Sequence, residues 1–275
     1  MNTQNRLTLV IGATGKTGRR VVQRLQSANH PVRIGSRTAN PGFDWNDQST
    51  WQAALKEVDA VYLTYYPDLA IPGAVETVRA FSEQAKINGV DHLVLLSGRG
   101  EEEAQNAEQV IQQSGIDWTI LRCSWFSQNF SENFLADSIN SGEVYLPVDK
   151  VKEPFIDADD IADVAYAALT EEGHKGQLYE LTGPRLISFA DAINEIAQAT
   201  GKNIQFIPVS IDEYNAALSE QNLPQEFSWL INYLFTTVLD GRNEFLTDGV
   251  QRALGRDAKD FNHYAQETAM KGAWG

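Results

Sequence analysis

The chain has 275 residues, of which 43% are hydrophobic, and its 37 acidic and 22 basic side chains give a formal net charge of -15. This length suffices for one large domain, or for one domain with an appendage, around a proper hydrophobic core. An acidic chain lacks the basic face that neutralises phosphates, which excludes nucleic acid from the expected partners. No run approaches the roughly 18 apolar residues that span a bilayer, and the start lacks the apolar segment of a signal peptide, so we expect a cytoplasmic protein with no membrane partner.

Short apolar runs alternate with helix-period segments through the N-terminal half, a pattern typical of β-α-β units around a parallel sheet. The runs that predict strands are 7–11, 31–34, 60–64, 92–96 and 118–121, with a short additional strand at 42–45 and a further one at 177–181. We therefore expect an α/β protein with a Rossmann-type, doubly wound parallel sheet.

The segments between these runs predict helices. The first follows the first strand with Gly18, Val22 and Leu25 on one face; the next cover 47–58 and, with Pro72 in the first turn, 72–88. A fourth carries Ala104, Ala107 and Ile111 inward, with Glu101 to Glu103 as a solvated first turn. Asp159 caps the fifth, and the sixth opens with a capping box from Ser188 to Asp191 and ends at Gly201.

The pattern changes near the C-terminus, where a strand at 204–208 is followed by mostly helical, aromatic-rich sequence. These residues predict a smaller, mostly helical C-terminal substrate lobe. We expect an NAD(P)-binding domain over residues 1–150 and a mixed region over 151–275, which completes the sheet and forms the substrate lobe.

Positive charge is concentrated at the start of this acidic chain. Residues 1–43 contain seven basic side chains and no Asp or Glu, so they carry +7 and the remaining residues carry -22. The clustering has two interpretations: a local positive field, or basic residues on solvated helix faces.

A glycine-rich turn joins the first strand to the first helix. Side chains are absent at three of its positions, so backbone N–H groups can approach a pyrophosphate at the positive end of the helix, and the third glycine lets helix and strand pack closely. The strand before it and the helix after it supply the context that a dinucleotide site requires. The residues of the turn are Gly12, Ala13, Thr14, Gly15, Lys16, Thr17 and Gly18.

The end of the second strand indicates which dinucleotide is bound. An NAD site places Asp or Glu there to hold the ribose 2'-hydroxyl, whereas this chain has Gly35, Ser36 and Arg37. A guanidinium binds a 2'-phosphate through paired donors, with Arg33 as a possible helper. We therefore expect NADP(H) as the cofactor; in the alternative interpretation Arg37 is an ordinary exposed residue at a strand end.

Four segments in this order resemble the NmrA-like family of atypical short-chain dehydrogenases/reductases, over nearly the whole chain. They are the turn 12–18, Val32-Arg-Ile-Gly-Ser-Arg37, Leu121-Arg-Cys-Ser-Trp-Phe126 and Asp157-Ala-Asp-Asp-Ile-Ala162. The resemblance is closest to the branch of NADPH-dependent quinone and triphenylmethane reductases and festuclavine-synthase-type imine reductases.

The resemblance implies roles for further residues. Asp44 and Trp45 would lie near the adenine, and Thr64, Tyr65 and Tyr66 would line the ribose and nicotinamide. Ser97 would end a strand close to the cofactor. Cys123, Ser124, Trp125 and Phe126 follow the strand where relatives place nicotinamide and substrate contacts. Tyr65, Tyr66, Trp125 and Phe126 could equally join the two lobes as core side chains, and Cys123 fits a small buried residue better than a nucleophile.

The acid–base apparatus of typical short-chain dehydrogenases is absent from the sequence. None of the nine tyrosines has a lysine four positions later, and Gln109 stands in the helix where relatives carry the lysine. Cys123 is the single cysteine, which excludes an intramolecular disulfide, and the four histidines are scattered without metal-ligand spacing, so we expect no metal site.

Two functions remain open. The first is an NAD(P)H-dependent reductase that delivers hydride to a small molecule already primed to accept it, such as a quinone, an iminium or a dye, with Tyr65, Tyr66 or Ser97 as proton donor. Its C-terminal aromatic residues, among them Trp229 and Tyr233, would then contact the substrate, although they could also form a helix-packing face or a partner surface. The second is a non-catalytic NADP(H)-sensing regulatory protein of the NmrA type, with a protein partner.

Overall fold

The computed structural model describes residues 6–132, 135–220 and 224–275. It forms two compact units. Unit 1 consists of Met1–Cys123, Ala158–Leu181 and Gly249–Arg256, and unit 2 of Ser124–Asp157, Thr182–Asp248 and Asp257–Gly275. The chain thus passes between the units several times. The division into a cofactor-binding domain over 1–150 and a substrate region over 151–275 stays a prediction. Among the described residues, no helix combines the length and apolar character needed to span a bilayer.

Unit 1 is built on a six-stranded parallel sheet in the order β2-β1-β3-β4-β5-β8. The chain goes from β1 to β2 on one side and then returns to β3 on the other, and this reversal is where doubly wound folds bind ligands. The strands are β1 (Thr8–Ile11), β2 (Val32–Gly35), β3 (Ala60–Leu63), β4 (His92–Gly98), β5 (Asp117–Cys123) and β8 (Gln177–Leu181).

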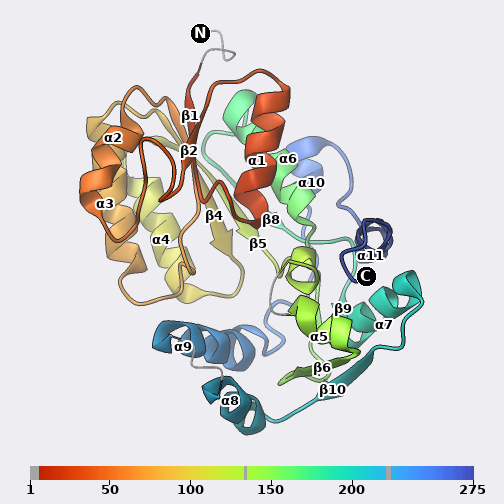
Figure 1. Ribbon diagram of the computed structural model, residues 1–275. Coiled ribbons are helices and arrows are strands. Elements are labelled where there is room, and N and C mark those ends of the chain that lie inside the picture. Colours follow the sequence, from red (N-terminus) through yellow and green to blue (C-terminus); the bar gives the residue numbers. More distant parts are fainter. Residues whose placement is uncertain (1–5, 133–134, 221–223) are drawn as a thin grey trace. The chain divides into compact units, whose positions relative to one another are not determined.

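Helices cover both faces of this sheet, which is why β1 and β3 are buried along their whole length (Figure 1). One face carries α1 (Lys16–Ser27), α6 (Ala158–Thr170) and α10 (Gly249–Leu254), and the other α2 (Trp51–Leu55), α3 (Ala74–Ile87) and α4 (Glu102–Gln113). The second face packs around Trp51, Phe81 and Leu63. The α/β, Rossmann-type prediction is confirmed.

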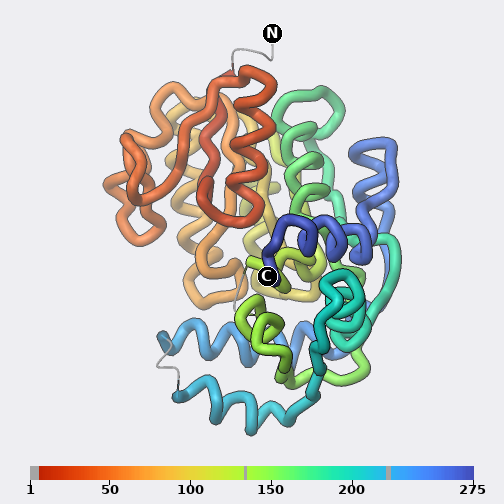
Figure 2. Tube along the Cα trace, turned by 45° about the vertical axis from the view of Figure 1, so that its right-hand side comes forward, coloured from red at the N-terminus to blue at the C-terminus, as the bar shows by residue number. Residues whose placement is uncertain are grey.

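Unit 2 combines small sheets with several helices. β6 (Glu143–Leu146) pairs in parallel with β10 (Gln205–Pro208), and β7 (Lys152–Glu153) pairs antiparallel with β9 (Ile187–Ser188). In Figure 2, α8 and α9 run side by side. The described helices of unit 2 are α5 (Leu135–Ser141), α7 (Phe189–Thr200), α8 (Ile211–Ser219), α9 (Gln225–Tyr233), the π-helical turn Leu234–Val238, α11 (Phe261–Met270) and the short 3-10 helix Ser127–Phe130.

The segment after β2 differs from the prediction. Residues 42–45 form an isolated bridge between Asp44 and Asp47 instead of a strand, because the Asp44 carbonyl accepts from the Trp51 indole at 2.8 Å and holds the segment in a compact loop. The helix predicted over 47–58 is shorter: the Asp47 side chain caps a 3-10 turn (Gln48–Thr50), and Glu57 takes a left-handed φ of 60° just beyond α2.

Helix starts show both agreement and corrections. The capping box at Ser188 and the left-handed Gly201 after α7 are confirmed. Pro72 precedes α3, because Gly73 in the left-handed region is its N-cap, and Asp159 lies inside the first turn of α6 rather than at its cap. Glu101 is only 7% exposed, so the solvated-turn interpretation is wrong for this residue, although Glu102 is exposed.

Replacing Ser188 by Ala should lower the free energy of unfolding by about 1 kcal/mol, because the hydroxyl that accepts from the Asp191 amide is lost. Urea denaturation measures the change. Ser228→Ala, in the middle of α9, is the matched control and should stay within about 0.5 kcal/mol; equal losses for the two variants would contradict the capping role.

Candidate cofactor site

The glycine turn closes tightly on the end of β1. Gly12 adopts a φ of +69°, donates its amide to Gly35 at 3.1 Å and accepts from the Gly15 amide at 2.8 Å. A Cβ on Gly12 would lie 2.2 Å from Thr64 Oγ1, and that hydroxyl donates to the Ile11 carbonyl at 3.1 Å. Only glycine fits here, both for its backbone angle and for the contact with the end of β3.

Gly18 lets α1 approach the sheet. A Cβ at this position would lie 2.1 Å from the Gly12 carbonyl oxygen, which is far inside van der Waals contact. The third glycine therefore has the packing role predicted from the sequence.

The N-terminus of α1 is suited to an anion. Gly15 is its N-cap, no side chain caps it and no acidic residue lies in its first turn. The first N–H groups of a helix have no partner within it and carry partial positive charge. Thr14 and Gly15 are exposed, whereas Ala13 and Thr17 are buried, so the turn would offer mainly backbone groups and the Thr14 side chain to a phosphate, with the half-buried Lys16 beside them.

Arg37 follows β2 and is exposed. Within the described ranges it makes neither an ion pair nor a side-chain hydrogen bond. Ser36 lies beside it and anchors the loop, since its carbonyl accepts from the Phe43 amide at 2.9 Å. Arg33 cannot help as predicted, because its guanidinium points away and donates to the carbonyls of Ala54 and Lys56 at 2.9 and 2.5 Å.

The loops after β2 and β3 are bound to each other. The Trp45 indole donates to the Thr64 carbonyl at 3.0 Å, and its ring lies 4.9 Å from the Tyr65 ring. Asp44 accepts from the Asn46 amide at 3.0 Å, which orders the same loop. The structure thus brings Asp44, Trp45, Thr64 and Tyr65 together beside the glycine turn, while Tyr66 is 66% exposed.

Ser97 and Cys123 lie at neighbouring strand ends but are buried. Ser97 is 5% exposed and its hydroxyl donates to Glu108 of α4 at 2.6 Å, while Arg122 donates to the same carboxylate. Burial raises the pKa of the Cys123 thiol, which makes this side chain a packing residue rather than a nucleophile.

The substrate residues predicted in unit 2 fall into two groups. Trp125 packs on Phe189 and Phe235 at 5.4 and 5.6 Å, while the backbone beside Phe126 pairs with Ile156. Trp229 and Tyr233 stack at 5.3 Å with their planes 5° apart and line a pocket of about 570 Å³ between α8 and α9. The pocket lining carries no charged side chain: Asn215, Leu218, Ser219, Gln225, Ser228, Trp229, Asn232, Tyr233, Thr236 and Thr237.

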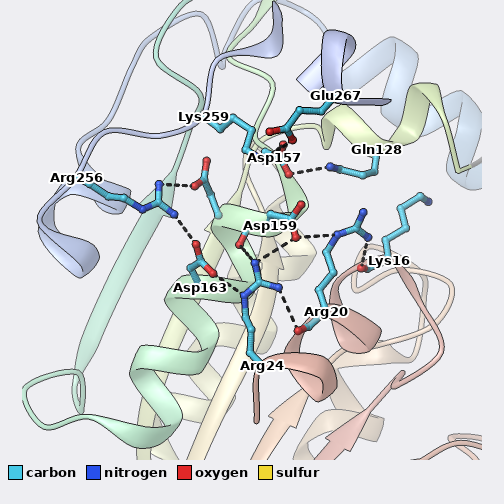
Figure 3. A network of polar contacts seen from close by, with 11 residues as sticks. Lys16, Arg20, Arg24, Gln128, Asp157, Asp159, Asp163, Arg256, Lys259 and Glu267 are labelled. Carbon is cyan, nitrogen blue, oxygen red and sulfur yellow. Dashed lines mark hydrogen bonds and ion pairs between the residues drawn. The ribbon is translucent and has the colours of Figure 1, made fainter. Parts of the chain in front are cut away.

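An ion-pair network in unit 1 compensates part of the N-terminal positive charge (Figure 3). Arg24 of α1 pairs with Asp159 and Asp163 of α6 at 3.1 and 2.5 Å, Arg20 approaches Asp159 at 3.3 Å, and Arg256 joins Asp163 from the end of α10. Much of the basic cluster therefore joins helices instead of forming an open field. Their acidic partners lie far along the chain, which is why composition could not show the pairing.

Unit 2 contains a smaller polar network of its own (Figure 3). The buried Asp157 accepts from Gln128 at 2.8 Å and lies 3.5 Å from Lys259, which also contacts Glu267 at 3.1 Å. Asp157 thus links the 3-10 helix Ser127–Phe130, through Lys259, to α11. In the segment 157–162, which carries the family resemblance, Asp157 therefore has a structural role.

Comparison with known proteins assigns the chain to a family. The model of an NAD(P)H-binding family matches residues 12–172. The chain is 30% identical to the Prestalk A differentiation protein A of Dictyostelium discoideum, and the match covers 94% of this chain and 91% of that protein. It is also 30% identical to an NAD(P)H azoreductase of Xenophilus azovorans, over 96% of this chain and 98% of that enzyme. Among solved structures, triphenylmethane reductase of a Citrobacter species, in complex with NADP(H), is similar with a TM-score of 0.75 at 19% identity over 96% of this chain and 99% of that one.

The chain belongs to this NAD(P)H-binding family, and its relatives include a named reductase.

Replacing Gly18 by Ala should weaken NADPH binding about tenfold or more, because the added methyl group forces the start of α1 away from Gly12. Fluorescence of bound NADPH measures the dissociation constant. A far-UV circular dichroism spectrum equal to that of the wild type separates a local effect from unfolding, and unchanged affinity in a folded variant would contradict the packing argument.

Proposed function

We propose that this chain is an NADPH-dependent reductase that transfers hydride directly to a small conjugated acceptor of the quinone, iminium or dye-like type. The observation that carries the cofactor choice is Arg37, which stands exposed after β2 where an NAD site has a carboxylate. The acceptor class rests on the chain's own aromatic residues and on the chemistry named for its relatives.

The 2'-phosphate of NADPH suits Arg37. A guanidinium presents paired donors to a phosphate, and an arginine without an intramolecular partner loses no ion pair on binding. The residues before it, Gly35 and Ser36, leave room, and Ser36 adds a hydroxyl. The end of β2 has no Asp or Glu, so no negative side chain there repels the phosphate.

The acceptor needs little acid catalysis. Azo compounds and triphenylmethane dyes, which the two reductases compared above act on by name, are electron-poor conjugated systems, as are quinones and iminium ions. Hydride addition to such a system gives a stabilised anion or amine, so positioning supplies most of the rate enhancement. This chemistry suits a chain without a Tyr-x-x-x-Lys pair.

Three residues are proposed as proton donors, and the structure ranks them. Tyr66 is the most exposed, Tyr65 is half-buried against Trp45, and the Ser97 proton is already donated to Glu108. We therefore place Tyr66 first, Tyr65 second and Ser97 last.

Aromatic contacts for the acceptor are proposed in unit 2. The Trp229–Tyr233 stack presents flat apolar faces in a pocket lined without charged side chains, which suits a conjugated ring system. Trp125 and Phe126 are the further candidates, in their half-buried positions.

Changing Arg37 to Asp should raise the dissociation constant of NADPH by about a hundredfold, because a charge-assisted phosphate contact becomes repulsive, and change that of NADH by less than about threefold. Fluorescence titration with both cofactors measures this. Arg79→Asp, at an exposed position of α3 with the same change of charge, is the control and should affect neither. Equal losses for NADPH and NADH would remove the argument for the 2'-phosphate.

Replacing Tyr66 by Phe should lower kcat at least tenfold for acceptors that need a proton, with KM changed less than about threefold. The measurement is loss of NADPH absorbance against quinones, iminium compounds, azo dyes and triphenylmethane dyes. Tyr145→Phe, at an exposed tyrosine of unit 2, should leave turnover unchanged. Tight NADPH binding without oxidation by any acceptor would refute the reductase proposal and favour the NADP(H)-sensing alternative.

A further inference from the structure

Two carboxyl groups meet in unit 1 at the carboxyl ends of β3 and β4. Asp68 lies in the loop 64–73 between β3 and α3, and Glu101 precedes α4. Their side chains are in hydrogen-bond contact. Two ionised carboxylates cannot hydrogen-bond each other, so this contact requires a proton between them.

The surroundings assign the proton. Asp68 accepts from the Ala70 amide at 2.9 Å, as an ionised carboxylate does. Glu101 is 7% exposed, and its Oε2 atom is buried without a donor among the described residues. Glu101 is therefore the protonated member, which donates to Asp68.

The charges around Glu101 support the same assignment. Burial first, and then the negative charges of Asp68, Glu103 and Glu108, raise the pKa of the Glu101 carboxyl well above its usual value. The N-terminus of α4 favours a carboxylate, but Glu101 makes no side-chain capping bond to that helix, so the helix does not offset these effects. Burial also raises the pKa of Asp68.

The fold leaves room for this contact. A Cβ on Gly98, at the end of β4, would lie 2.3 Å from Glu101 Oε1. Glycine at this position thus allows the Glu101 side chain to fold back under the strand end toward Asp68 instead of extending into solvent as Glu102 does.

The loop 64–73 also carries Thr64, Tyr65 and Tyr66. We propose that the proton shared between Asp68 and Glu101 fixes this loop, so that the two residues are a positioning pair for the proposed reductase site and release the loop when the proton is lost. The consequence for catalysis rests on the proposed function. The linkage between the proton and the loop rests only on the contact between Asp68 and Glu101.

The sign of the pH dependence follows from the raised pKa. The folded state holds a proton that the unfolded state has already released, so the contribution of the pair is present at low pH and is lost as pH rises through the folded-state pKa. Above that point the carboxylates of the buried Glu101 and the half-buried Asp68 repel each other, and the loop between β3 and α3 opens.

Hydrogen exchange of the unliganded protein tests this. Between about pH 5 and about pH 9, protection of amides 64–73, corrected for the intrinsic exchange rate, should fall in the wild type by up to about tenfold per pH unit until pH reaches the raised pKa of Glu101, and should then level off. Glu101→Gln keeps a donor to Asp68 without a titrating proton and should remove the fall. Glu102→Gln, an equal change of charge at the exposed neighbour, should behave as the wild type.

Asp68→Asn provides an independent variant: it removes the negative charge beside Glu101 but leaves Glu101 buried, so the fall in protection should become smaller than in the wild type. Protection that stays flat in the wild type, or that falls equally in the wild type and Glu101→Gln, overturns the proposal. Because no cofactor or acceptor is present, a failed search for acceptors would leave this result intact. NADPH affinity then reports the consequence for the site: it should weaken with rising pH in the wild type and stay constant in Glu101→Gln.

Discussion

The approach of Gly18 to the Gly12 carbonyl is the contact on which the cofactor site depends. It brings the start of α1 against the end of β1, so that the free N–H groups of the helix and the exposed backbone of the turn face the same point. The same turn contacts Thr64, whose carbonyl accepts a hydrogen bond from the Trp45 indole. Three loops at neighbouring strand ends thus take their positions from one close backbone contact.

Charge in unit 1 is organised around that arrangement. Three of the seven basic residues near the N-terminus are engaged within the unit in this way: Arg20 and Arg24 by acids of α6, and Arg33 by backbone carbonyls. Arg37 differs from them, because it stands exposed where a ligand can reach it. A clustering that looks uniform in the sequence therefore separates into a structural part and a part that can bind.

Much of the fold could be predicted from the sequence, because its signals are local. Buried strands show as apolar runs, the glycine turn stands between a strand and a helix, and the Ser188 capping box lies within four residues. The absence of a strand at 42–45 could not be predicted, since it depends on Asp44 and Trp51 meeting in space. The same holds for Glu101, which looks like a solvated helix start until the loop carrying Asp68 folds against it, and for Ser97, whose hydroxyl is engaged by Glu108 across to α4. Pairings of this kind join residues with no common period in the sequence.

The burial of Cys123 has a chemical consequence if the acceptor is an electrophile of the proposed type. Quinones and related acceptors add to thiolates, and this chain has one thiol, which is 4% exposed and held in its protonated form by burial. The protein consequently offers such molecules no exposed thiolate. An acceptor of the proposed type would find no reactive cysteine to which it could add.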